Sequence, residues 1–182
     1  MGMAATIPYY TVADLEHFPN DGNRYELLDG VLLVTPAPNA VHQLLTIRLT
    51  YILMREFKTF DRAYVFGPGA VSFPPRTQLE PDVLVVPARV PVSRKWHDYK
   101  EHWLAVEIYS PSSRIYDRDF KRDAYHTLGV HEVWLVDIDD RSVAVSRKVG
   151  ESVIVRDAIR WHVPVLDIGV SVSLTELFAG IE

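Results

Sequence analysis

The sequence contains no cysteine among its 182 residues, which excludes disulfide bonds and metal sites built on thiolates. No apolar run approaches the roughly 18 residues that a membrane-spanning helix needs, and no secretory signal pattern is present at the start. Acidic residues outnumber lysine and arginine by 24 to 19, giving a formal net charge of −5. Strong unselective binding to nucleic acid depends on the opposite charge balance. We therefore expect a cytoplasmic protein without membrane contact, in which a basic face for a nucleic acid would have to be local.

What the chain does contain is typical of one globular domain. It is 48% hydrophobic and 24% charged, which is enough apolar material for a substantial core at this length. No internal repeat or linker divides it, so we expect a single domain over residues 1–182. Asp29–Gly30 predicts a hairpin turn between two strands, because both central residues of a type I′ turn need a positive φ. Asn39 is placed to cap a long helix whose apolar residues follow the 3,4 spacing.

The remaining patterns complete a mixed α/β fold. Short apolar runs bounded by turn residues predict further strands, and Ser173 opens a capping box before a terminal helix. Gly129 predicts the end of a helix that starts after Pro111. The expected elements are a short helix at 11–18, strands at 25–28 and 31–35, a helix at 40–58, strands at 63–66, 70–73, 82–86 and 103–109, a helix at 111–128, and strands at 132–137, 142–146 and 152–155. The order predicts a central mixed sheet flanked by helices, with an N-terminal hairpin and a C-terminal meander.

Two acids stand in or beside apolar strands, where a carboxylate needs compensation. Glu107 lies in the middle of the run Leu104–Tyr109, and Asp82 lies at the start of the run that follows Pro81. Leaving an ionised carboxylate in a dry core costs several kcal/mol unless a cation, a metal or a raised pKa offsets it. If the two strands are neighbours, both carboxylates converge on one hard cation such as Mg²⁺, which suits phosphoryl chemistry. The alternative is that Asp82 is exposed and Glu107 pairs with an arginine.

The helix after Glu107 adds basic residues. Arg114, Arg118, Lys121 and Arg122 share one arc of about 100° on a helical projection. A second arc carries Phe120, Ala124 and Leu128 and is predicted to face the sheet, with Lys121 on the boundary between the two arcs. The arginines are candidates for phosphate contacts. The alternative is an ordinary solvated helix face, which is the usual meaning of such a charge run.

Several segments, taken together and in order, resemble the Uma family of restriction-endonuclease-like proteins. They are Arg24–Gly30, Pro81–Val86, Val106–Ser113, Asp117–Tyr125 and Gly129–Asp137. The resemblance implies the fold of the PD-(D/E)XK nuclease superfamily, in which acids bind a divalent metal and a lysine assists the attack of water on phosphate. It matches Asp82 and Glu107 to the two motif acids.

One position departs from the superfamily pattern. The lysine expected two residues after Glu107 is replaced by Tyr109, and the resemblance implies that Lys121 on the following helix takes its place. The resemblance also matches Glu26 to an upstream acid, as a further metal ligand; its alternative is an edge-strand acid that faces water. The implied cofactor is Mg²⁺ or Mn²⁺.

Other candidates have two readings each. His42, near the start of the first long helix, faces the acids or else has a capping or surface role. Tyr125 lies four residues after Lys121 and either packs over the lysine or substrate or is a core tyrosine. Three aromatic residues near the polar loop, Trp96, Tyr99 and Trp103, are candidates for a homodimer surface.

The leading hypothesis is a Mg²⁺-dependent endonuclease that hydrolyses phosphodiester bonds in nucleic acid, with DNA as the expected partner. Its rival is a catalytically inactive nuclease-like fold that binds nucleic acid or another protein. A glycoside hydrolase using the same two acids fits poorly, because that chemistry requires neither a lysine nor a metal. The rivals differ in where Lys121 points and in how far Asp82 lies from Glu107.

Overall fold

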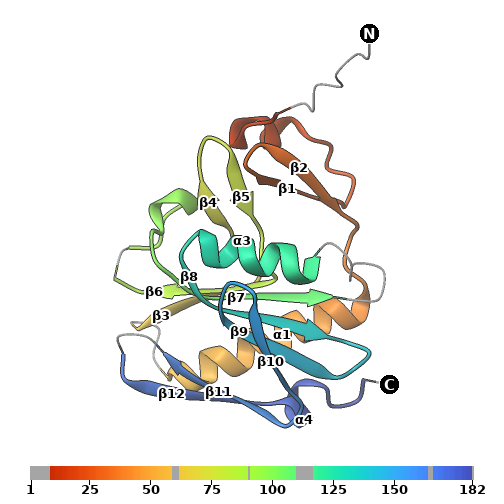
Figure 1. Ribbon diagram of the computed structural model, residues 1–182, viewed down its shortest axis with the longest axis vertical. Coiled ribbons are helices and arrows are strands. Elements are labelled where there is room, and N and C mark those ends of the chain that lie inside the picture. The colour runs from red at the N-terminus through yellow and green to blue at the C-terminus, as the bar shows by residue number, and fades with distance from the viewer. Residues whose placement is uncertain (1–8, 59–61, 90, 110–116, 164–165, 182) are drawn as a thin grey trace.

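A six-stranded mixed sheet runs through the middle of the protein (Figure 1). The computed structural model describes residues 9–58, 62–89, 91–109, 117–163 and 166–181. The sheet has the strand order β10-β9-β8-β7-β6-β3. Its strands are β3 (Ala63–Phe66), β6 (Val83–Pro87), β7 (His102–Tyr109), β8 (Val130–Asp137), β9 (Ser142–Lys148) and β10 (Glu151–Val155). Within this sheet only the β7–β8 pair is parallel. Parallel neighbours need a crossover connection, and the one between β7 and β8 contains the helix that carries Lys121.

The expected mixed α/β fold is confirmed, and its N-terminal hairpin belongs to a second sheet. This sheet has the order β2-β1-β5-β4 and consists of β1 (Arg24–Leu28), β2 (Val31–Thr35), β4 (Val71–Phe73) and β5 (Thr77–Leu79). Asp29 and Gly30 have φ values of 51° and 82°, as the predicted turn requires. The short helix η1 (Val12–His17) is a 3-10 helix, and its Thr11–Asp14 capping box is present. A second 3-10 turn, η2 (Trp96–Asp98), precedes β7.

Helices and a small hairpin cover the two faces of the central sheet (Figure 1). Helix α1 (Ala40–Phe57) lies on one face with the hairpin β11 (Ala158–Val163) and β12 (Ile168–Ser173) and with α4 (Leu174–Leu177). Helix α3 (Arg122–Thr127) lies on the other. The predicted caps are present: Asn39 Oδ1 accepts a hydrogen bond from the backbone N–H of His42, and Ser173 Oγ accepts one from that of Glu176. The predicted meander is also present as β8-β9-β10, but it does not end the chain, because β11 and β12 follow.

The helix after β7 differs from its prediction in phase. Its described part begins with a π-helical turn, η3 (Asp117–Lys121), before α3. Such a turn contains more residues than an α-helical turn, so the 100° projection used for the sequence does not hold across it. Phe120 is consequently 50% exposed, and its predicted place against the sheet is wrong. Ala124 is buried as expected, and Leu128 is partly buried.

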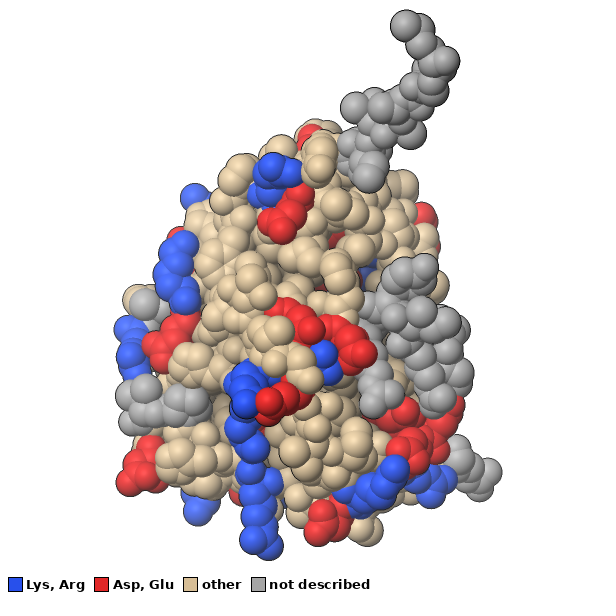
Figure 2. All heavy atoms as spheres, viewed as in Figure 1, with Lys and Arg blue, Asp and Glu red and all other residues tan. Residues whose placement is uncertain are grey.

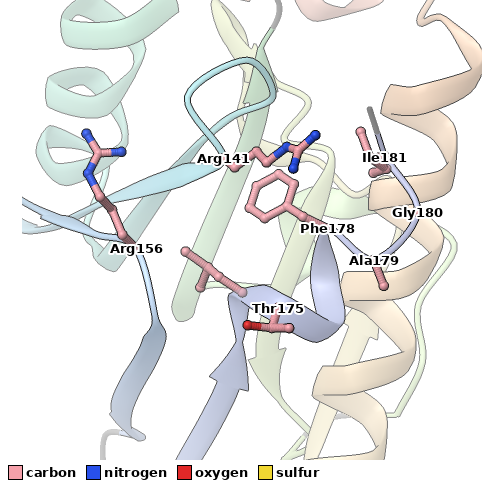
Figure 3. A pocket seen from close by; sticks show the side chains of 8 residues that line it. Arg141, Arg156, Thr175, Phe178, Ala179, Gly180 and Ile181 are labelled. Carbon is pink, nitrogen blue, oxygen red and sulfur yellow. The ribbon is translucent and has the colours of Figure 1, made fainter.

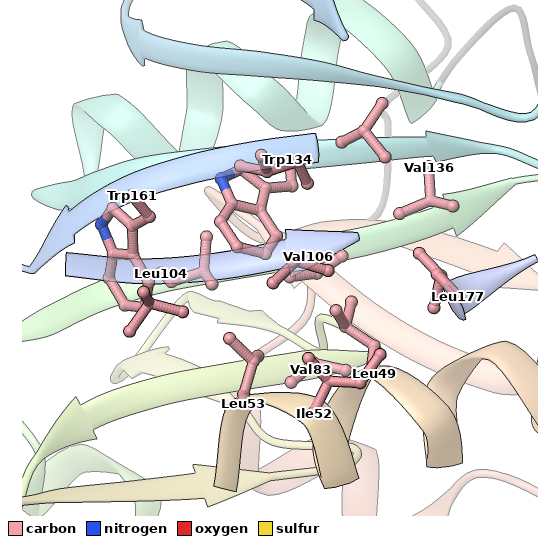
Figure 4. Close-up of a cluster of buried hydrophobic side chains, with 14 of the residues drawn as sticks. Leu49, Ile52, Leu53, Val83, Leu104, Val106, Trp134, Val136, Trp161 and Leu177 are labelled. Carbon is pink, nitrogen blue, oxygen red and sulfur yellow. The ribbon is translucent and has the colours of Figure 1, made fainter. Parts of the chain in front are cut away.

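Two hydrophobic clusters follow from the alternation of the strands. Residues that face α1 form the larger cluster, in which apolar side chains of the sheet, α1 and β11–β12 pack together (Figure 4). Among them, Trp134 and Trp161 pack edge to face with centroids 5.7 Å apart. The opposite face packs against α3 and includes Ala105 and Tyr109. Because Glu107 lies between these two residues in β7, its side chain belongs to the α3 face.

His102 at the start of β7 predicts acid sensitivity. It is 1% exposed, and neither ring nitrogen has a partner among the described residues. Burial, helped by His131, lowers its pKa from 6.5 to about 4. The unfolded chain therefore binds this proton at a higher pH than the folded chain, and stability is lost as the pH falls from about 6.5 to about 4. We expect His102 to cost about 2 kcal/mol of unfolding free energy between pH 7.5 and pH 5.

Urea unfolding of wild type and His102→Leu at these two pH values measures this cost. The variant is expected to lose about 2 kcal/mol less than wild type on acidification. The exposed His97 supplies the control, since His97→Leu is expected to keep the acid sensitivity of wild type. An equal acid response of wild type and His102→Leu would show that His102 is not the group responsible.

No helix in the described part of the chain is long and apolar enough to cross a membrane.

Candidate active site

Asp82 and Glu107 face each other across two neighbouring strands. In the antiparallel β6–β7 pair, Val83 lies opposite Val106, so the same register places Asp82 opposite Glu107. Directly opposite residues in such a pair have Cβ atoms about 5 Å apart. Both side chains are buried, at 2% and 5% exposure. The strands are therefore neighbours, as the metal-site hypothesis required, and the exposed Asp82 of the alternative reading is excluded.

Asp82 is surrounded by donors and cations. Its Oδ2 accepts a hydrogen bond of 2.8 Å from the backbone N–H of Ile108 and lies 3.0 Å from His42 Nε2. Arg24 Nη1 lies 2.9 Å from Oδ1. Burial alone would raise the pKa of Asp82, but the hydrogen bond with His42 and the charge of Arg24 outweigh it and lower the pKa. Asp82 is therefore an ionised carboxylate inside the protein, and His42 faces the acids.

Lys121 points inward and joins two acids. Its Nζ donates to Glu26 Oε2 at 2.7 Å and to Glu107 Oε1 at 3.3 Å, and the residue is 2% exposed. Glu26 is fully buried on β1, where its Oε1 accepts the backbone N–H of Glu80 at 2.7 Å. The reading of Glu26 as an edge-strand acid that faces water is wrong, because β1 is an inner strand between β2 and β5 and Lys121 packs against Glu26. Three distant segments thus meet at one ammonium group.

Tyr125 completes the surroundings of Glu107. It is fully buried, one helical turn after Lys121, and its hydroxyl donates to Glu107 Oε1 at 2.6 Å. Burial raises the pKa of Glu107 to about 8, because the neighbouring acids Asp82 and Glu26 add to it and Lys121 opposes it only in part. The pKa of Tyr125 is also raised, first by burial and then by Glu107, so its hydroxyl stays a donor.

The donor set fits a hard divalent cation. Arg24 pairs with Asp82 Oδ1 as an ion pair, and this buried carboxylate oxygen has no hydrogen-bond donor of good geometry among the described residues. Carboxylate oxygens are the ligands that Mg²⁺ and Mn²⁺ take. Within the described residues, no three acidic or histidine side chains form a ready ligand cage, because Lys121 lies between Glu26 and Glu107.

The predicted phosphate-binding arginines have different outcomes. Arg114 and the side chain of Arg118 lie outside the described residues. Arg122 is mostly buried and is held by Asp119 at 2.8 Å and Asp123 at 2.7 Å. A contact between Arg122 and phosphate stays a prediction. Figure 2 shows acidic and basic side chains interspersed over the described part of the visible face, without an extended basic patch.

Arg24 is the site residue that sequence reasoning missed. It contacts Asp82 directly, and it stands two residues before Glu26, so both project from the same face of β1. That period-two spacing beside a recognised acid was the available signal.

The aromatic residues proposed as a dimer surface are mostly internal. Trp103 is 0% and Tyr99 is 2% exposed, so neither can contact a second chain without unfolding. Both belong to the hydrophobic clusters on the two faces of the sheet. The interpretation of these two residues as an interface is therefore wrong, because Trp103 lies in β7, which is buried on both faces, and Tyr99 follows η2 and packs into the cluster on the α3 face.

Two cavities elsewhere lack the chemistry of this site. One of about 370 Å³ lies beside α4 and has Arg141 and Arg156 near an apolar floor that includes Phe178 (Figure 3). Among the described residues, no acidic or histidine side chain lines it. Another, of about 510 Å³, lies between the β1–β2 turn and α3, and three aspartates line it, which disfavours a phosphate. The buried acid and lysine cluster is thus the candidate active site.

Comparisons with known proteins identify the family and the fold of the chain. The family model Uma2, described as "Putative restriction endonuclease", matches residues 12–181. A crystal structure from Anabaena variabilis, described as a "putative nuclease belonging to DUF820", is similar in fold, with a TM-score of 0.73 and 19% sequence identity. The alignment covers 92% of this chain and 97% of that one. A search of curated proteins finds no match.

Proposed function

Since the chain belongs to the Uma2 family of nuclease-like proteins, we propose that it is a Mg²⁺- or Mn²⁺-dependent endonuclease that hydrolyses phosphodiester bonds, with DNA as its substrate. The observation that carries the proposal is the buried contact of Lys121 with Glu26 and Glu107, next to Asp82 on the neighbouring strand. Two acids for a metal and an ammonium group for the phosphate are what metal-assisted phosphodiester hydrolysis needs.

In this proposal Asp82 and Glu107 hold the metal, and Glu26 is a further ligand. A bound divalent cation lowers the pKa of its water and offsets negative charge on the phosphate. Lys121 orients the attacking water or stabilises the charge that develops on the phosphate oxygens. His42 and the backbone N–H of Ile108 keep Asp82 ionised and fix its orientation. Tyr125 fixes one oxygen of Glu107 by its hydrogen bond.

The acid pair is tested with Asp82→Asn, which keeps the shape of the side chain and removes its charge. We expect wild type to cut DNA in Mg²⁺ or Mn²⁺ and the variant to be at least about 100-fold slower, because the ionised ligand is lost. The assay compares double-stranded DNA, single-stranded DNA and RNA by gel electrophoresis. The control is Asp140→Asn, which removes an aspartate on the β8–β9 turn that pairs with Arg156.

Cleavage by Asp82→Asn at the rate of wild type would contradict the proposed metal site. Binding of nucleic acid without cleavage by wild type would favour the inactive, nuclease-like alternative. A homodimer and a cytoplasmic location stay predictions, and the mass of the protein in solution checks the first of them.

A further inference from the structure

Arg24 occupies an unusual position for a buried ion pair. It stands at the start of β1, where its side chain is 19% exposed while that of its partner Asp82 is 2% exposed. Its Nη1 lies 2.9 Å from Asp82 Oδ1 and donates to the backbone carbonyl of Glu80, also at 2.9 Å. Strand β1 thus presents a cation to one site acid and, two residues later, an acid to Lys121.

The contacts of Arg24 use only part of its guanidinium group. Nη1 makes both contacts, whereas Nε and Nη2 have no partner among the described residues. The side chain is 19% exposed, and neither nitrogen is among the fully buried unpartnered atoms of the described residues. Nε and Nη2 form one edge of the planar fork, and this edge matches two oxygens of a phosphate.

Neutralising Asp82 does not by itself require an arginine. A contact through one nitrogen is within the reach of a lysine, which is a point charge. Burial would lower the pKa of Arg24, but the charges of Asp82, Glu107 and Glu26 raise it, so the group remains a cation. An arginine here therefore provides what a lysine would not, namely a free pair of donors beside the proposed metal ligands.

We propose that Arg24 contacts the substrate: Nη1 remains anchored on Asp82 and Glu80, and Nε and Nη2 donate to non-bridging oxygens of the phosphodiester. This inference rests on the proposed function for the identity of the anion. It makes Arg24 a substrate-binding residue that couples phosphate recognition to the orientation of Asp82.

Binding is tested with a fluorescent DNA oligonucleotide and with the same sequence carrying neutral methylphosphonate linkages. Fluorescence anisotropy is measured in Ca²⁺ in place of Mg²⁺. Wild type is expected to prefer the charged oligonucleotide, and Arg24→Lys to reduce that preference at least tenfold, because it keeps the charge and loses the fork. Arg48→Lys is the matched control, since Arg48 is another arginine bonded to backbone carbonyls, those of Leu177 and Ala179. It is expected to retain the preference.

The outcomes separate this inference from the proposed function. An unchanged preference in Arg24→Lys overturns the role of Arg24, whatever the cleavage assay shows. Failure of wild type to cut any substrate in Mg²⁺ or Mn²⁺ overturns the proposed function, while the binding comparison still decides on Arg24. If Arg24→Lys does not fold, the comparison is made in an Asp82→Asn background, in which removal of Arg24 leaves no unpaired carboxylate at position 82. The double variant Asp82→Asn/Arg24→Gln is then compared with Asp82→Asn alone. A tenfold loss of preference there supports the inference, and no loss overturns it.

Discussion

Replacing Lys121 by methionine is expected to reduce DNA cleavage at least about 1,000-fold and to destabilise the fold by about 3 kcal/mol. The ammonium group contacts both Glu26 and Glu107 inside the protein, so its loss leaves the fully buried Glu26 without its cationic partner and removes one of the two donors to Glu107 among the described residues. Methionine keeps most of the length and apolar volume of the stem. Cleavage rates in Mg²⁺ and urea unfolding curves at pH 7 measure the two effects.

A double variant separates the structural effect of Lys121 from its chemical one. Glu26→Gln/Lys121→Met removes the ammonium group together with the fully buried carboxyl group of Glu26, which lies 2.7 Å from it in the wild type. We expect most of the lost stability to return, while cleavage stays absent. The control is Lys148→Met, an exposed lysine paired with Glu151 on the surface, which should change neither quantity. Cleavage by Lys121→Met within tenfold of wild type would exclude Lys121 from the chemistry.

Glu107→Gln is expected to stabilise the protein at alkaline pH while abolishing cleavage. The pKa of Glu107 is raised to about 8 by burial, so the folded state holds a proton that the unfolded chain has already released. Stability is therefore present below the ordinary glutamate pKa and is lost as the pH rises through about 8. Glutamine never ionises, and its Oε1 still accepts the hydrogen bonds from Tyr125 and Lys121.

Unfolding curves at pH 5 and pH 8 measure this difference. We expect the variant to gain on the order of 3 kcal/mol relative to wild type between these pH values, because one pKa unit corresponds to about 1.4 kcal/mol. Glu101→Gln supplies the control, since Glu101 pairs with Arg89 at the surface. If wild type loses no more unfolding free energy than Glu107→Gln between pH 5 and pH 8, then Glu107 is not the titrating group.

Local signals predicted local structure well. The Asp29–Gly30 turn and the Asn39 cap were correctly placed, because each depends on the backbone preferences of one or two residues. The hairpin β11–β12 was missed, although Ile159, Trp161 and Val163 alternate with exposed residues. In the paired hairpin these apolar side chains are buried against α1 and the large sheet. Only that contact distinguishes the hairpin from a loop rich in apolar residues.

The candidate site was predicted in composition more than in arrangement. Asp82 and Glu107 stood out because carboxylates in apolar strands need compensation, and Lys121 and Glu26 followed from the family resemblance. The contact of Arg24 with Asp82 is a tertiary one, made across 58 positions of the sequence. The period-two spacing places Arg24 and Glu26 on one face of β1, but it does not indicate which residues that face contacts. The π-helical turn at Asp117–Lys121 likewise shifted Phe120 to the surface against the helical projection.

The sequence by itself determined the absence of thiolate chemistry, the turn and cap positions, and the two strand acids that require a partner. It left open whether Lys121 faces water or the acids, and whether Glu26 is buried. The tertiary structure decided both, because strand register sets Asp82 opposite Glu107, and the crossover after β7 brings Lys121 over β1. Register and crossover depend on how entire elements pack, so they are fixed only when the sheet and its covering helices assemble.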